Sequence, residues 1–418
     1  MKKRYKASHC ASGESLQREN SAEKAKAYQR CTLLSELPFP VIGSLNAVHM
    51  FAANHGATLK STTTSDAKIV WRDFHDSLSL IVITGNDQAN DCHLNRLLEN
   101  VWSAMVMLFG QDELMNIKNL ERFKRDIKVC FQLLDHLLEQ SVLSTFSDVT
   151  QAVDILLTPD NGALQNFLDA FVEAAGSTYG CLTVGGRVAV ATHKWWSLSA
   201  TELVLLGVLI PLLTPCTSRD IPIYLPQGSP TVPHRLLTFQ VMRGVEVCVI
   251  CGPTPSVADL HNEVVRFWRP AVEVLKAAYQ VIPRYVPSTL TLDQNILGFL
   301  LVNNETSRCL NSVCVHGKDG KEEIVSLPKR REILRSFYKR VVGTYMSSPI
   351  EGTETGPAEF SHTATDTYTV CEGHKCYALS SPPHQLFVLY TSAIPTFAMR
   401  SITNKTLHAF TKDKSFCI

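Results

Sequence analysis

The chain has 418 residues, 40 basic and 39 acidic side chains for a net charge of +1, and 45% hydrophobic residues. This length predicts two or three domains, and the hydrophobic content indicates packed cores instead of general disorder. Balanced charge argues against a dedicated nucleic-acid-binding protein. The longest apolar run, 203–213, is too short to span a bilayer and predicts a buried helix.

Residues 1–35 are polar, and no apolar run follows their basic start as it would in a secretory signal. They also lack an apolar helical face, so we expect this segment to be disordered. The thirteen cysteines are scattered through hydrophobic segments. We therefore expect reduced, buried thiols in an intracellular protein.

Residues 36–157 form the first expected domain. Apolar residues recur at helical spacing over 114–140, which predicts one long amphipathic helix. The expected elements are a helix at 41–53, strands at 57–63, 68–74 and 78–84, and helices at 93–110 and 114–140.

Residues 158–282 form the second expected domain, beginning at the turn-rich run TPDNG. Gly185-Gly186 and Arg243-Gly244 predict tight hairpin turns, because glycine readily takes a positive φ. Ser199 with Glu202, and Ser256 with Asp259, predict helix starts. The expected elements are a helix at 164–175, strands at 178–184 and 187–193, a helix at 203–213, a strand at 221–225, a loop at 226–233, strands at 236–242 and 245–251, and a helix at 257–280 bent at Pro270.

Residues 290–418 form the third expected domain. Its expected elements are strands at 296–302 and 308–315, a helix at 329–346, a polar loop at 347–366, strands at 368–370, 375–379 and 386–390, and a helix at 400–410. The second and third domains thus share the order β-β-α-β-β-β-α, and the first shows it without the opening hairpin. We expect three copies of one α/β unit, each with its own sheet and with flat surfaces instead of a catalytic pocket.

The sequence contains none of the catalytic or metal-binding motifs that we searched for. The chain has no GxSxG, GxxxxGK[ST] or HExxH motif, so we expect no catalytic or cofactor-binding residues. Cysteines three apart on a strand point to opposite faces, which disfavours a shared metal. The groups considered are Cys248 with Cys251, Cys309 with Cys314, and Cys371 with His374 and Cys376, the last lacking an apparent fourth ligand. We therefore expect no metal.

Most histidines are expected on surfaces or loops, without catalytic roles; those considered are His49, His75, His193, His234 and His261. Trp195-Trp196 is either an exposed partner anchor or, as we favour, helix-on-sheet packing.

Three cations, Arg331, Arg335 and Lys339, are spaced four apart along an expected helix. They form a positive stripe that could contact acidic lipid headgroups or an acidic protein surface. A solvated helix face is the alternative, and the one we favour.

Several stretches carry a family resemblance. They are LPFPVIGSLNAVHMF (37–51), VWRDFHDSLSLIVI (70–83), FVEAAGST (171–178), VAVATHKWW (188–196) and YLPQGSPTVPHRLLT (224–238). From about Leu37 to its end, the chain resembles the Fuzzy family of planar cell polarity effectors. The resemblance implies three longin (profilin-like) domains, each a mostly antiparallel five-stranded sheet flanked by helices. This agrees with the element order above.

The resemblance further implies a non-catalytic subunit of the ciliogenesis and planar polarity effector complex. It implies pairing with Inturned, work with a WD-repeat planar polarity effector, and guanine nucleotide exchange on a Rab-type GTPase. A cytoplasmic location at the cytoskeleton and ciliary basal body is implied, with roles in cilium assembly, intraflagellar transport and Hedgehog signalling. A trafficking adaptor without exchange activity is the alternative, and a hydrolase or metal enzyme is disfavoured because no motif supports it.

One departure concerns the first domain, because residues 1–35 do not supply the apolar hairpin with which the family's domain opens. Either the start is an alternative or mispredicted exon, or a partner strand completes the sheet. In both cases neighbouring strands would lack a hydrogen-bonding partner in the free protein. We predict fast amide exchange throughout residues 68–84 of the isolated chain; strong protection there would contradict this.

Overall fold

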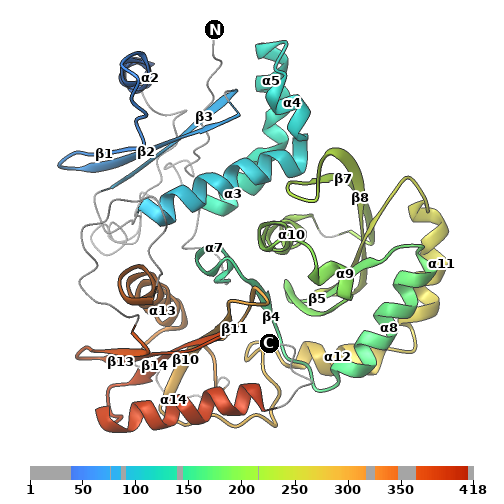
Figure 1. Cartoon of the computed structure of the whole chain (residues 1–418). Coiled ribbons are helices and arrows are strands. Elements are labelled where there is room, and N and C mark those ends of the chain that lie inside the picture. Colours follow the sequence, from blue (N-terminus) through green and yellow to red (C-terminus); the bar gives the residue numbers. More distant parts are fainter. Residues whose placement is uncertain are drawn as a thin grey trace, which may run out of the picture. The chain divides into compact units, whose positions relative to one another are not determined.

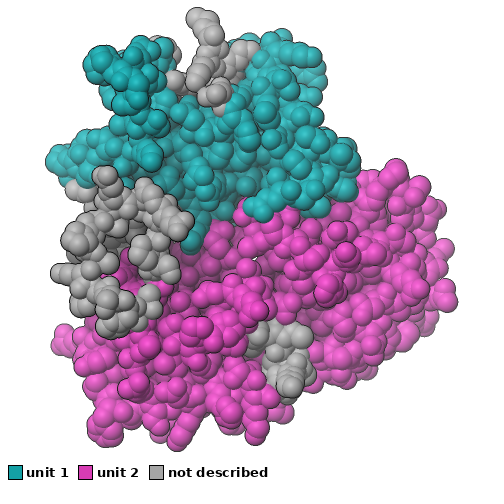
Figure 2. Space-filling view, viewed as in Figure 1, with its two compact units in different colours: residues 1–143, 208–213, 222–234 teal, residues 144–207, 214–221, 235–418 magenta. Residues whose placement is uncertain are grey.

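The computed structural model describes residues 39–75, 77–85, 91–138, 145–214, 216–316, 325–346 and 364–412. The expected disorder of residues 1–35, and most of the expected loop at 347–366, lie outside these ranges. The chain divides into two compact units, shown in teal and magenta in Figure 2. The first comprises residues 1–143, 208–213 and 222–234, and the second comprises the rest. Within the described ranges, no helix has the length and apolarity to cross a bilayer.

The first unit is built on an antiparallel sheet with the strand order β1 (Ser61–Thr63), β2 (Ala67–Phe74), β3 (Leu78–Gly85). Trp71 and Ile81 lie opposite each other and pack with Leu45 of helix α2 (Phe39–Asn54). Phe74 stacks on Trp102 of helix α3 (Asp91–Phe109), with ring centroids 4.9 Å apart. The sheet is therefore covered by α2 on one face and α3 on the other (Figure 1).

The prediction of a single long helix over 114–140 is wrong. The structure breaks it into α4 (Gln111–Met115), α5 (Leu120–Asp126), the 3₁₀ turn η1 (Ile127–Cys130) and α6 (Phe131–Leu138). Asn119 starts α5, because its side chain accepts hydrogen bonds from the backbone N–H groups of Glu121 and Arg122. The expected apolar stripe is nevertheless buried at Phe123, Ile127 and Leu134.

The second unit contains most of an eleven-stranded sheet. Its order is β12 (Asp366–Val370), β13 (His374–Ser381), β14 (His384–Thr391), β10 (Ile296–Asn303), β11 (Arg308–Ser312), β4 (Val153–Ile155), β6 (Arg187–Ala191), β5 (Tyr179–Val184), β9 (Val245–Cys251), β8 (Ser229–Met242) and β7 (Ser218–Leu225). Five antiparallel strands lie on each side of β4. Read from the outer edge inward, both groups place the last three strands of their domain first and its opening hairpin next to β4. The two five-strand groups are therefore copies of one topology.

The prediction that the second and third domains have separate sheets is wrong, because their strands belong to one sheet. The short strand β4 pairs in parallel with β11 on one side and with β6 on the other, which merges the two sheets. No strand was predicted at 153–155, because three residues are too few to show an alternating pattern.

Helices complete both copies in the expected order. The second domain has α8 (Asn161–Ala174), α9 (His193–Trp196), α10 (Ala200–Leu212), α11 (Val257–Trp268) and α12 (Val272–Gln280). The third has α13 (Leu327–Val341), the π-helical turn η2 (Val342–Met346) and α14 (Thr396–Thr411). The second core gathers around Phe171, Phe239 and Trp268, and the third around Phe337 and Phe387.

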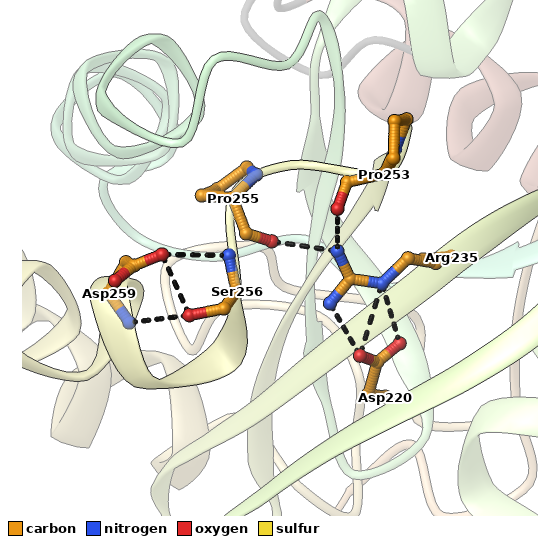
Figure 3. A network of polar contacts seen from close by, with 6 residues as sticks. All are labelled: Asp220, Arg235, Pro253, Pro255, Ser256 and Asp259. Atoms are coloured by element: carbon orange, nitrogen blue, oxygen red, sulfur yellow. Dashed lines mark hydrogen bonds and ion pairs between the residues drawn. The ribbon is translucent and has the colours of Figure 1, made fainter.

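The predicted local signals are confirmed. Gly185, Gly186 and Gly244 have positive φ angles at their hairpin turns. Glu202 and Ser199 exchange the two hydrogen bonds of a capping box, as do Asp259 and Ser256, the latter shown in Figure 3. Strand β8 begins at Ser229, so the loop expected at 226–233 is shorter than predicted.

Gly110, which precedes α4 in the first unit, has a φ of 85°, and a Cβ atom there would lie 2.8 Å from Cζ of Tyr224. Gly110→Ala combines backbone strain with a steric clash, so we predict a loss of ~2–4 kcal/mol of stability. Gly207→Ala is the control, since its Cβ would meet nothing within 4 Å inside α10. It should be neutral or gain up to ~1 kcal/mol. Thermal unfolding of the two variants checks this; equal effects would contradict it.

Candidate functional site

The first candidate site is the seam where β4 joins the two five-strand groups of the second unit. Asp154 of β4 is 5% exposed, and its carboxylate accepts hydrogen bonds from the backbone N–H groups of Phe146 and Ser147. The side-chain amide of Asn311, on β11, also donates to it. The buried carboxylate is thus fully engaged by hydrogen-bond donors from its own segment and from the third domain.

Arg187 extends this network into the second domain. Its guanidinium donates to the backbone and side-chain oxygens of Asn311, both at 2.7 Å, and lies 3.4 Å from the ring centroid of Tyr285. Burial raises the pKa of the Asp154 carboxyl, while the Arg187 charge and the hydrogen bonds from Asn311 and the backbone oppose that rise. Asn311 therefore links a buried cation to a buried anion across the seam.

A second buried ion pair anchors the segment before β4. Arg335 of α13 donates to Asp148 of helix α7 (Ser147–Thr150) through both terminal nitrogens, one of them at 2.8 Å, and to the carbonyl oxygen of Thr145 at 3.0 Å. Phe146 beside it is fully buried in the third core. The segment from 145 to 155 therefore packs as part of the third domain.

The three cations of the predicted positive stripe, Arg331, Arg335 and Lys339, do not lie on one exposed surface. Arg335 is 7% exposed because it pairs with Asp148, whereas Lys339 is exposed and Arg331 is half-buried. Burial, followed by the nearby charge of Arg187, lowers the pKa of Arg331. The sequence spacing correctly placed these residues on one helix. It could not show that Arg335 is covered, because the covering residues, Thr145 and Asp148, are distant in sequence.

Other sequence candidates are dispersed. Trp195 is buried, as expected for packing, while Trp196 lies under the guanidinium of Arg308, 3.9 Å from its ring. His49, expected on a surface, is buried with Nε2 3.2 Å from a carboxylate oxygen of Asp73.

The cysteines fall mostly in the cores: Cys248, Cys251, Cys309, Cys314 and Cys376 are buried, and Cys371 is exposed. Among the described residues, no three His, Cys, Asp or Glu side chains are grouped so as to hold a metal ion.

The second candidate site is the outer surface of α2 in the first unit. This 16-residue helix contains no Asp, Glu, Lys or Arg, and Val41, Val48 and Phe51 are 41%, 53% and 65% exposed. Their spacing of seven and three residues places them on one side of the helix, away from buried His49. Exposed apolar side chains gathered on one helix are typical of a protein–protein contact. We refer to these three residues as the α2 surface.

Comparison with known proteins defines the class. Residues 18–137, 175–269 and 295–414 match models described as the first, second and third longin domains of FUZ, MON1 and HPS1. The chain is therefore a three-longin-domain protein of this type. The first match begins at residue 18, so the similarity extends further toward the N-terminus than the expected start near Leu37.

The particular family follows from full-length relatives. The chain is 46% identical over 392 residues to "Protein fuzzy homolog" of Xenopus tropicalis, covering 91% of this chain and 93% of the relative. It is 40% identical over 392 residues to "Protein fuzzy homolog" of Homo sapiens, covering 90% and 91%. The chain belongs to the Fuzzy family.

The seam yields a stability prediction. Arg335→Met should cost ~3–5 kcal/mol, because it leaves the buried Asp148 carboxylate without its cation. Combining it with Asp148→Leu should recover most of that loss. Lys339→Met, on the same helix but exposed, should change stability by at most ~1 kcal/mol. Chemical denaturation of the three variants checks this, and a double variant no more stable than Arg335→Met would contradict it.

Proposed function

We propose that this protein is a non-catalytic longin subunit that pairs with Inturned to form a guanine nucleotide exchange factor for a Rab-type GTPase. Membership of the Fuzzy family supports this. The observation that carries the proposal is the α2 surface, three exposed apolar side chains on a helix of the first longin domain that contains no Asp, Glu, Lys or Arg. Such a surface suits a protein partner better than a small molecule, because it offers apolar area without convergent polar groups.

The mechanism needs no nucleophile or metal. An exchange factor binds the nucleotide-free GTPase more tightly than the nucleotide-bound form, so binding energy alone favours nucleotide release. In this proposal the fused second and third domains act as one rigid support. Their buried seam supports this role, since Arg335 and Arg187 tie together segments distant in sequence.

The proposed biological setting is the ciliogenesis and planar polarity effector complex. There the protein would work with a WD-repeat planar polarity effector at the basal body, in cilium assembly, intraflagellar transport and Hedgehog signalling. The proposed domain bounds along the chain are 36–157, 158–282 and 290–418, with the end of the first range, 145–155, packing on the third domain. The repeated five-strand order supports the last two. Contact of exposed Lys339 with an anionic membrane or acidic protein remains part of the proposal, and nucleic acid does not.

We predict that Val48→Asp combined with Phe51→Asp abolishes co-purification with Inturned. Burying a carboxylate in place of each apolar side chain removes ~1.5–3 kcal/mol per site, which corresponds to at least ~100-fold in affinity. Val129→Asp is the matched control, because Val129 is 59% exposed in the same unit but lies outside α2. Gel filtration of co-expressed proteins is the measurement. An unchanged heterodimer peak for the α2 variant would exclude this surface as the contact.

Release of labelled GDP from a panel of Rab GTPases then separates exchange from adaptor function. The purified heterodimer should accelerate release from at least one of them, and the α2 variant should not. A heterodimer that accelerates none would favour the trafficking-adaptor alternative.

A further inference from the structure

The eleven-stranded sheet has two ends that differ in chemistry. At one end, β7 contains Pro222 within the strand, and its Arg219 and Asp220 are held by ion pairs to Glu246 and Arg235. Figure 3 shows Arg235 bridging Asp220 and the carbonyl oxygens of Pro253 and Pro255. Proline and charged side chains on an outer strand discourage further strands from pairing with it.

The other end has no proline and one charged residue, Asp366. Strand β12 reads Asp-Thr-Tyr-Thr-Val, a β-prone sequence without proline or lysine, and among the described residues its backbone pairs with β13 as its one strand neighbour. Tyr368 and Val370 are 56% and 52% exposed. An outer strand with exposed apolar residues and no blocking device is a template for pairing with another strand.

The phase of the hydrogen-bond ladder shows which backbone groups are available. Ser380 donates its N–H to Thr365 O, and Cys371 donates to His374 O, so alternate residues from 365 to 371 bond to β13. By alternation, the N–H and C=O groups of Asp366, Tyr368 and Val370 point away from β13. The backbone groups that point away from β13 therefore belong to the two residues with exposed apolar side chains and to Asp366.

Side chains define the surface beside this edge. Thr369 accepts a hydrogen bond from Arg340 of α13 at 2.8 Å, so Tyr368 and Val370 face the opposite side, that of α14. There Lys375, opposite Val370, donates to Ile394 O, just before α14. Phe397, in the first turn of α14, is 88% exposed. Tyr368 and Val370, with Phe397 of the helix on the same side of the sheet, are exposed apolar side chains, and we call these three residues the β12 edge surface.

Charge indicates what this edge would accept. Arg340 lies on the α13 side of β12, and Arg400 and Lys375 lie on the α14 side. The carboxylate of Asp366 is already engaged, by Arg400 at 3.2 Å and by the hydroxyl of Tyr377 at 2.5 Å. Antiparallel pairing of two copies of β12 about Tyr368 would bring these cations together, which disfavours self-association. An acidic partner strand is favoured instead.

We propose that β12 is a strand-addition site for an extended segment of another protein, with apolar side chains at alternate positions and a carboxylate that reaches Arg340 or Arg400. Backbone hydrogen bonds to residues 366, 368 and 370 supply affinity, and the β12 edge surface supplies specificity. This site is on the third domain and does not depend on the α2 surface or on exchange activity.

The test uses random twelve-residue peptides displayed on phage and selected on the full-length chain. Selected peptides should alternate apolar residues with polar ones and be enriched in acidic residues. Their binding should protect the amides of 366, 368 and 370 from hydrogen exchange. Val370→Pro removes an outward N–H without removing a bond to β13, so it should weaken binding at least ~10-fold.

Val370→Ala is the matched control, because it keeps that N–H and should weaken binding no more than ~3-fold. Unchanged exchange protection of β13 and β14 in Val370→Pro establishes that the sheet is intact. The proposal is wrong if no selected peptide depends on the N–H of residue 370, or if the peptides protect other segments. Concentration-dependent dimerisation of the free chain that Val370→Pro abolishes would overturn it in favour of a second copy as occupant.

Discussion

The hydrogen bonds from Arg187 to Asn311 join the second and third longin domains beside the buried carboxylate of Asp154. Because a charge buried without partners would be strongly destabilising, the chain supplies this carboxylate with donors: two backbone amides of its own segment and the side-chain amide of Asn311 on β11. Asn311 in turn accepts hydrogen bonds from Arg187 of β6. β4 pairs with β11 and with β6 beside these groups. The seam therefore sets the register between the two repeated topologies.

This arrangement explains how repeated domains become one support. Each longin copy buries its own core, around Phe171 in the second and Phe387 in the third, and each could pack without the other. The seam adds polar contacts that only the correct pairing satisfies, which favours one relative arrangement of the two copies. The contacts that we propose with other proteins lie on the outer surfaces, where α2 and β12 display exposed apolar side chains.

Local signals made much of the fold predictable. Gly185-Gly186 and Gly244 take positive φ as hairpin glycines do, and Ser256 with Asp259 forms the expected capping box, because these patterns depend only on near neighbours. The merged sheet was not predictable, since β4 is three residues long and lies in a parallel pairing. The burial of Arg335 was not predictable either, because its partner Asp148 is remote in sequence. Exposure of the α2 surface depends on which helix face meets the sheet.

Native-state hydrogen exchange under increasing denaturant tests the central claim most directly, that the seam makes two longin domains one cooperative unit. Slowly exchanging amides of β5 and β9 and those of β10 and β14 should converge on the same opening free energy and the same denaturant dependence. Two sets of amides with distinct opening free energies, divided at β4, would contradict it.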